Sequence, residues 1–261
     1  MTGPMKLTFL GTGSSGGTPD VHRGWCECDP ANPKNRRSRP SVLIQTEQTT
    51  VLVDTSPDLR QQLLDARTAH LDAVLYTHAH ADHLHGIDDL RAVNRALGHA
   101  VDCYGDAETL EAIRLRFGYV LEPLAAGATT VYKPSLVPNV IRPGESFRIG
   151  DVPVLAFAQD HGYGRTLGYR FGDVAYSTDV VELDDAAFDA VAGVKTWIVG
   201  VLVAHPHPTH AHVDKALAWM ERAGVERGFF THISPFLDHA ALEARLPAHV
   251  RPAYDGLVIE A

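Results

Sequence analysis

Apolar residues in this chain of 261 residues occur in short runs, separated by segments rich in glycine, proline or charged residues. Runs of about four to eight apolar or alternating residues between turn residues are typical of β-strands, and apolar residues at helical spacing predict amphipathic helices. Strand-like and helix-like segments alternate along the chain, which predicts an α/β fold. The expected strands are 6–10, 41–45, 50–53, 73–76, 100–104, 147–149, 152–158, 166–170, 174–176, 197–203, 229–231 and 256–260. The expected helices are 58–66, 87–97, 106–117, 188–191, 213–222 and 239–245.

The segment 118–140 is the least regular part of the chain. Pro123, Gly127, Pro134 and Pro138 interrupt it, and proline and glycine are the strongest breakers of regular structure. We expect a loop there that either covers a cleft or packs on the surface. No linker, repeat or change of composition marks a boundary, so the sequence predicts a single domain over residues 1–261.

Composition and charge narrow the class of protein. A run of roughly 18 apolar residues, which a membrane-spanning helix needs, does not occur, and residues 1–6 do not begin a signal peptide. Three cysteines do not suggest a disulfide framework. We therefore expect a soluble, cytoplasmic protein without a membrane partner. The formal net charge of −9 argues against extended nucleic acid as a partner, because nucleic-acid-binding proteins usually present a basic face.

The segment 76–86 concentrates metal-binding side chains directly after an apolar strand. It contains His78, His80, Asp82 and His83. Side chains alternate along an extended segment, so His78 and His80 point the same way and suit one metal. Asp82 and His83 follow at the turn into the next helix and suit a second metal. Imidazole and carboxylate ligands together favour two divalent ions, zinc first and manganese as the alternative.

Two other segments are less specific. The glycine-rich loop 11–17 is neither a Walker loop nor a dinucleotide fingerprint, but its glycines allow close approach of the backbone to a ligand. Arg36, Arg37 and Arg39 form a basic cluster, for which a solvated loop is a better interpretation than a phosphate site.

The pattern T-H-x-H-x-D-H-x-x-G at 77–86 resembles the signature of the metallo-β-lactamase fold hydrolases. The segment 86–94 and the T-H-I-S sequence at 231–234 resemble the PhnP-like cyclic phosphodiesterases within that superfamily. The resemblance implies a four-layer αβ/βα sandwich, in which two mixed sheets are flanked by outer helices and the metals lie at one edge.

The resemblance also implies a full ligand set. His161 follows a strand and precedes a glycine, Asp179 lies in an S-T-D sequence after a strand pair, and His232 lies in T-H-I-S. In this interpretation Asp54, at the end of an apolar strand, bonds to the ligand loop and orients it. One metal would be held by His78, His80 and His161, the other by Asp82, His83 and His232, with Asp179 as a bridge.

The implied activity is hydrolysis of a small phosphodiester, a cyclic phosphate or nucleotide, by a hydroxide that the two metals activate. His212 is the expected proton donor, with His207 and His210 as rivals, and Asp82 is the other catalytic residue. A tRNA 3′-processing nuclease and a thioester or lactone hydrolase are the alternatives, and a non-catalytic metal-dependent nucleotide binder is a third. The sequence identifies no substrate-binding residue, and the resemblance implies a homodimer.

A separate structural zinc of the PhnP-like group is expected to be absent. Its ligands there are a C-x-C-x-x-C segment and a histidine near the last metal ligand. Here Cys26 and Cys28 remain, but Ala31 and Pro235 stand at the other two positions. Two ligands do not close a tetrahedral zinc site. His22 or Asp29 would be the substitutes if a metal were retained.

Overall fold

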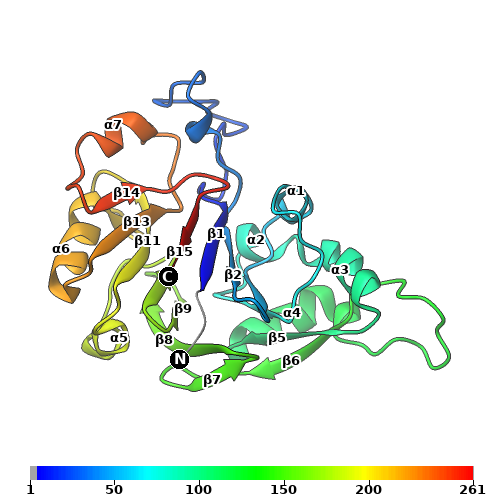
Figure 1. Ribbon diagram of the computed structural model, residues 1–261. Coiled ribbons are helices and arrows are strands. Elements are labelled where there is room, and N and C mark those ends of the chain that lie inside the picture. The colour runs from blue at the N-terminus through cyan, green and yellow to red at the C-terminus, as the bar shows by residue number, and fades with distance from the viewer. Residues whose placement is uncertain (1–4, 261) are drawn as a thin grey trace.

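Two β-sheets pack face to face in the computed structural model, which describes residues 5–260 (Figure 1). The first sheet is mixed and has the strand order β15-β1-β2-β3-β4-β5-β6. Its antiparallel half joins β15, β1, β2 and β3, and β3 to β6 run parallel. Its strands are β1 (Lys6–Gly11), β2 (Ser41–Gln45), β3 (Thr50–Val53), β4 (Ala73–Leu75), β5 (Val101–Gly105), β6 (Leu136–Val140) and β15 (Val258–Glu260).

The second sheet has the order β14-β13-β11-β10-β9-β8-β7, with β12 beside β11. It is also mixed, because β10, β11, β13 and β14 run parallel whereas β7, β8 and β9 form antiparallel pairs. Its strands are β7 (Ser146–Ile149), β8 (Val152–Asp160), β9 (Arg165–Phe171), β10 (Val174–Ser177), β11 (Thr196–Val203), β12 (Ala211–His212), β13 (Arg227–Thr231) and β14 (Val250–Pro252).

The helices lie on the outer faces of the two sheets (Figure 1). Those that follow strands of the first sheet are α1 (Leu59–Asp65), α2 (Ala81–Leu84), η2 (Ile87–Asp89), α3 (Leu90–Leu97), α4 (Ala107–Phe117) and η3 (Gly118–Val120). Those of the second sheet are α5 (Asp185–Val191), α6 (Val213–Ala223) and α7 (His239–Glu243). A further 3₁₀ turn, η1 (Pro33–Asn35), lies in the N-terminal segment between β1 and β2.

Three hydrophobic clusters fill the three interfaces between these four layers. Strand β2 illustrates the alternation that produces them: Val42 and Ile44 belong to the cluster between the sheets, whereas Leu43 faces the helices. The third cluster packs α5, α6 and α7 on the second sheet around Trp197. Because both faces of each sheet are buried, apolar residues dominate most strands, as the sequence indicated. The four-layer αβ/βα sandwich is confirmed.

The topology brings the ends of several strands to one edge of the sandwich. Strands β8, β10 and β13 run in the same direction within the second sheet, so their carboxyl ends meet at that edge. Strand β4 of the first sheet ends there as well, because Tyr169 of β9 donates a hydrogen bond to the carbonyl of Tyr76 (2.6 Å). The loops after these four strands carry the predicted metal ligands.

The structure differs from the predicted elements in a few places. Strand β6 lies inside the segment expected to be irregular, and it contains Pro138. Proline is tolerated there because β6 is an edge strand that pairs only with β5. The helix expected over 87–97 is divided into η2 and α3. Among the described residues, no helix is long and apolar enough to cross a membrane.

Candidate active site

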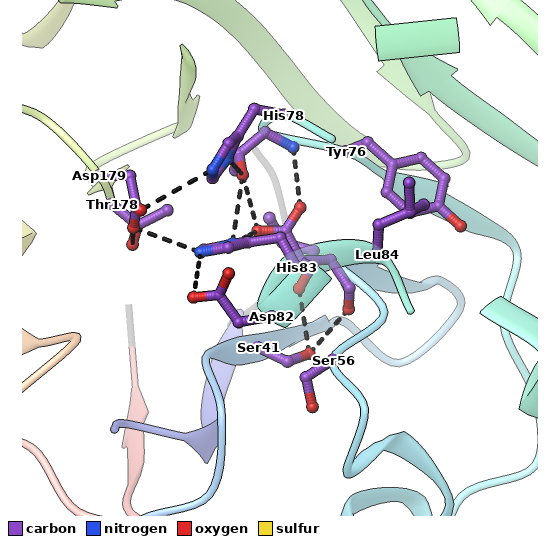
Figure 2. Close-up of polar contacts among 12 residues, drawn as sticks. Ser41, Ser56, Tyr76, His78, Asp82, His83, Leu84, Thr178 and Asp179 are labelled. Atoms are coloured by element: carbon purple, nitrogen blue, oxygen red, sulfur yellow. Dashed lines mark hydrogen bonds and ion pairs between the residues drawn. The ribbon is translucent and has the colours of Figure 1, made fainter. Parts of the chain in front are cut away.

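Seven predicted ligands lie together in two groups at the edge of the sandwich where β4, β8, β10 and β13 end. One group contains His78, His80, His161 and Asp179, and the other contains Asp82, His83, His232 and Asp179. In each group the candidate ligand atoms all lie within 4.8 Å of one another. All seven side chains are buried except that of His80. Figure 2 shows His78, Asp82, His83 and Asp179 pointing toward a common centre.

Asp179 belongs to both groups because its two carboxylate oxygens face different histidines. Oδ2 lies 3.7 Å from His78 Nε2 and 3.6 Å from His161 Nε2. Oδ1 lies 3.3 Å from His83 Nε2 and 3.2 Å from His232 Nε2. A carboxylate shared in this way is suited to bridge two cations.

The histidine tautomers fit cation binding. The Nδ1 atom of His161 lies 2.7 Å from the carbonyl oxygen of Thr209, which only accepts, so Nδ1 carries the proton. In neutral imidazole, Nε2 then presents a lone pair, here toward the carboxylate of Asp179. The Nε2 atoms of His78 and His83 are also buried without a hydrogen-bond partner. Lone pairs that face carboxylate oxygens across 3.3–3.7 Å are the donor set that divalent ions require.

Asp54 lies behind this layer and ties it together. Its Oδ2 is 2.6 Å from His83 Nδ1 and accepts a hydrogen bond from the Thr77 hydroxyl (2.7 Å). Its Oδ1 accepts from the Thr77 amide at 2.8 Å. Thr77 Oγ1 in turn lies 3.0 Å from His78 Nδ1. One fully buried carboxylate therefore orients His83 directly and His78 through Thr77.

The charges of the site are strongly coupled. Burial raises the pKa of Asp179, but the adjacent imidazoles of His232 and His83 outweigh burial and hold that pKa well below its usual range. Burial lowers the pKa of His83, but the carboxylates of Asp179 and Asp82 outweigh it and raise that pKa well above its usual range. Buried carboxylates at this density attract positive charge, which divalent ions would supply.

The backbone is unusual at three of the site residues. Asp54, Asp179 and His232 have φ values of 64°, 49° and 54°, in the left-handed region that non-glycine residues rarely adopt. Each directly follows, or lies two residues beyond, the end of a strand. Such conformations persist only where the surrounding structure imposes them, and they are frequent at functional sites. Sequence patterns gave no sign of this feature.

A cavity of about 430 Å³ opens over the two groups. Ser15 of the glycine-rich loop lines it, so this loop borders the site. The other walls come from α4, which the sequence had not indicated, from the loop between β8 and β9 that carries His161, and from Thr209 and His210. The lining residues outside the two groups are Ser15, Ala79, Asp106, Glu108, Thr109, Ala112, Arg116, Tyr163, Gly164, Arg165, Thr209 and His210.

Of the three histidines weighed as proton donors, His210 alone lines this cavity within residues 5–260. Its Nε2 atom lies 3.3 Å from Asp179 Oδ2, and its Nδ1 atom lies 2.7 Å from the hydroxyl of Thr209. His207 packs edge-on behind it, with 5.2 Å between ring centroids. His212, in β12, instead occupies the N-cap position of α6 and pairs with Val203 of β11. The structure therefore does not bring His212 to the other predicted site residues.

Cys28 is buried against Arg37 and the segment after β13. Its Sγ atom lies 3.4 Å from the carbonyl of Pro235 and 3.7 Å from Arg37 Nη1. Cys26 is exposed. Arg37 also donates to the carbonyls of Ser234 and Leu237. A guanidinium beside the thiol disfavours a cation there, which supports the predicted absence of a structural zinc.

The other two arginines of the basic cluster interact within the protein. Arg39 pairs with Asp58 at 2.8 Å, and Arg36 stacks over the ring of Trp25 at 5.2 Å. Both line a larger cavity of about 780 Å³ that contains none of the predicted ligands.

Comparison with known proteins agrees with this geometry. The Beta-lactamase superfamily domain matches residues 49–233. A crystal structure described as a new diphosphatase from the PhnP family is similar with a TM-score of 0.89 and 32% identity, over 99% of this chain and 97% of that chain. The family resemblance and the fold expected from it are confirmed.

Two curated relatives extend the comparison. An octanoyltransferase of Porphyromonas gingivalis is 32% identical over 259 residues, 97% of this chain, but this chain spans about half (51%) of that protein. A ribonuclease Z of Mycobacterium bovis is 27% identical over 258 residues, 88% of this chain and 86% of that protein. The domain match and the PhnP-family structure together show that this chain belongs to the metallo-β-lactamase fold hydrolases and, among them, to the PhnP family.

Proposed function

We propose that the protein is a dinuclear metal phosphodiesterase that hydrolyses a small phosphodiester or diphosphate. The observation that carries the proposal is the division of the Asp179 carboxylate between two histidine groups, with His210 beside the same carboxylate. Two divalent ions, zinc first and manganese as the alternative, would be held by the seven ligands. When bound, they would activate water for attack and offset the negative charge of the phosphoryl oxygens.

The residues of the chain have distinct roles in this proposal. Asp54 directs the His83 ring and, in the neutral imidazole that a cation requires, fixes the tautomer with the proton on Nδ1 and the lone pair on Nε2. His161 is fixed in the same way by the Thr209 carbonyl. His210, rather than His212, donates the proton that the departing alkoxide or phosphate requires, because its imidazole lines the cavity and is held by the Thr209 hydroxyl. A positioned imidazole is the usual group for that task near neutral pH.

The shape of the site favours a small substrate. The cavity of about 430 Å³ is of the size that encloses a small molecule. The ribonuclease Z similarity keeps a tRNA 3′-processing nuclease as the alternative, but the net charge of −9 does not favour a long polyanion. The third expectation, a thioester or lactone hydrolase, would use the same ligands on a carbonyl group.

A substrate panel tests the proposal. Metal-loaded protein is assayed with bis(p-nitrophenyl) phosphate, cyclic nucleotides, nucleoside diphosphates, a tRNA precursor, thioesters and lactones. We expect turnover of the small phosphorus esters or anhydrides, and loss of turnover with a chelator. Turnover confined to the tRNA precursor, or to thioesters and lactones, would replace the proposal with that alternative.

Three expectations about the whole protein accompany this proposal. Three free cysteines suit a reducing compartment, so we place the protein in the cytoplasm. The family resemblance implies a homodimer, which light scattering of the purified protein checks. A single domain over residues 1–261 is supported by the hydrophobic cluster that both sheets share.

A further inference from the structure

The turn between β8 and β9 presents an aromatic side chain beside a predicted metal ligand. Tyr163 lies two residues after His161, and its side chain lines the active-site cavity. The turn is tight: the Tyr163 amide donates to the His161 carbonyl (3.1 Å), and the His161 amide donates to the Gly164 carbonyl (2.9 Å). Gly162 has a φ of 83°, and a Cβ there would lie 2.5 Å from the Pro208 carbonyl oxygen. The backbone that carries the Tyr163 ring is therefore fixed at the edge of the cavity.

Tyr163 is 92% exposed, against 39% and 48% for the exposed tyrosines 119 and 132. Both of those use the hydroxyl within the protein, toward Asp88 and the amide of Ala125. No hydrogen bond of the Tyr163 hydroxyl occurs within the described part of the chain. A large apolar ring left open to water contributes little to folding, but it is a surface on which a flat ring can stack.

One face of α4 also lines the cavity. Thr109, Ala112 and Arg116 lie at helical spacing on that face. Arg116 is fixed over the ligand loop, because its Nη1 donates to the carbonyl of Ala79 (2.5 Å). Arg165, at the start of β9, lines the same cavity. Two arginines, Tyr163 and the predicted metal ligands therefore share one cavity.

These two arginines lack acidic partners. Neither Arg116 nor Arg165 forms an ion pair within residues 5–260, although the chain has an excess of acidic residues. By contrast, Arg39, Arg114 and Arg222 each pair with a carboxylate. A guanidinium that faces a cavity without a partner suits the oxygens of a phosphate group, which it can bind with two hydrogen bonds.

We infer that the β8–β9 turn and α4 form a nucleotide subsite, in which Tyr163 stacks on the base while Arg116 and Arg165 pair with phosphate oxygens. This inference rests on the proposed function and specifies its substrate as a compound with a nucleoside on one side of the scissile phosphate linkage. The base would lie over the β8–β9 turn and the scissile group over Asp179.

Equilibrium binding tests the subsite without turnover. Isothermal titration compares adenosine 5′-monophosphate with ribose 5-phosphate, which carries the same sugar phosphate without the base. We expect the wild-type protein to bind the nucleotide at least tenfold more tightly. Tyr163→Ala should remove most of that difference and leave ribose 5-phosphate binding unchanged, whereas Tyr163→Phe should retain it. Arg165→Gln should weaken both ligands.

Tyr132→Ala is the matched control, because Tyr132 is an exposed tyrosine that does not line the cavity. Equal affinity of the wild type for the two ligands, no measurable binding of either, or a preference unaffected by Tyr163→Ala would each overturn the subsite. The proposed hydrolysis fails in a different way. In that case the nucleotide binds with the expected preference, but the metal-loaded protein cleaves no phosphorus ester or anhydride.

Discussion

The carboxylate of Asp54 lies 2.6 Å from Nδ1 of His83, and both side chains are fully buried. Asp54 only accepts hydrogen bonds when ionised, so in neutral His83 it directs the proton to Nδ1 and the lone pair of Nε2 toward Asp179 and Asp82. An asparagine at this position has an amide group that can donate to Nδ1 and so reverse the tautomer.

We therefore expect Asp54→Asn to weaken metal binding by about 10–100-fold, mainly at the group that contains His83. Competition with a coloured chelator measures both affinities. Asp173→Asn is the control, because Asp173 forms an exposed pair with Lys195 far from the site. Unchanged metal affinity of the Asp54 variant would show that the hydrogen bond to Asp54 does not determine how His83 binds metal.

Metal stoichiometry tests the two-group arrangement. We expect two divalent ions per chain after purification without chelator and incubation with zinc or manganese, because seven ligands exceed what one zinc needs. Asp82→Ala should release one ion in preference to the other, since Asp82 belongs to one group only. Asp179→Ala should weaken both. Elemental analysis that stays below one ion per chain would contradict the dinuclear site.

The position of His210 predicts a leaving-group effect. His210→Ala should lower kcat by about 10²–10⁴-fold for substrates with an alkoxide leaving group, because the proposed proton donor is removed. The loss should be much smaller for p-nitrophenyl esters, whose leaving group departs without a proton. Steady-state kinetics on a matched pair of esters measure both. His212→Ala should leave kcat unchanged for both esters. A large loss of kcat in that variant would instead assign the proton donor to His212, as the sequence analysis expected.

The hydrogen bonds of Arg37 tie the segment between β1 and β2 to the segment after β13, and we expect them to contribute to stability. Arg37→Leu should lower the free energy of unfolding by about 2–4 kcal/mol, because the buried carbonyls of Ser234 and Leu237 lose their donors. Urea denaturation measures this change, and Cys26→Ser, at an exposed thiol, is the neutral control.

We expect no third tightly bound zinc at Cys26 and Cys28. A zinc released on mutation of Cys26 and Cys28 would refute this.

His239 predicts a loss of stability in mild acid. Burial, and after it the charge of Lys34, lower its pKa to about 4 against the opposing charge of Glu243. Arg37 and Asp238 are the other charged groups near it. The unfolded chain, with an ordinary histidine pKa of about 6.5, binds a proton before the folded chain does. The contribution of neutral His239 to the free energy of unfolding is therefore fully present above about pH 6.5. It falls by about 3 kcal/mol as the pH drops to about 4.

The pH dependence of urea unfolding, compared between the wild type and His239→Phe, isolates this effect. Phenylalanine retains the edge contact with Tyr254 and removes the two ring nitrogens, which have no hydrogen-bond partner. The difference between the two proteins should shrink as the pH rises from 4 to 6.5. Parallel curves over that range would assign the acid sensitivity to other groups.

The alternation of apolar strands with helices predicted an α/β fold, and the resemblance to the metallo-β-lactamase fold hydrolases implied the four-layer sandwich. The ligand loop was equally visible, since His78, His80, Asp82 and His83 are local in the chain. The choice among His207, His210 and His212 was not predictable. It depends on how β12 pairs with β11 and on the bond from the Ala211 amide to the carbonyl of Val180, in the loop after β10.

Other parts of the site left no local pattern. Arg116 reaches the cavity from α4, more than thirty residues beyond the ligand loop, and Tyr163 is an isolated aromatic residue in a glycine turn. Strand β6 was missed because Pro138 argues against a strand unless the strand is known to lie at an edge. The positions of Arg116 and Tyr163 and the formation of β6 depend on contacts between segments that are distant in the sequence.

The left-handed backbones of Asp54, Asp179 and His232 have a consequence for the abundance of the protein. Strain on the order of 1 kcal/mol at each position opposes folding, as do the crowded carboxylates. Cations that bind only the folded chain raise its stability by an amount that grows with their free concentration. In a cell starved of divalent metal, a larger fraction of chains is therefore unfolded and exposed to proteases. The amount of this protein would then follow the metal supply without any transcriptional regulator.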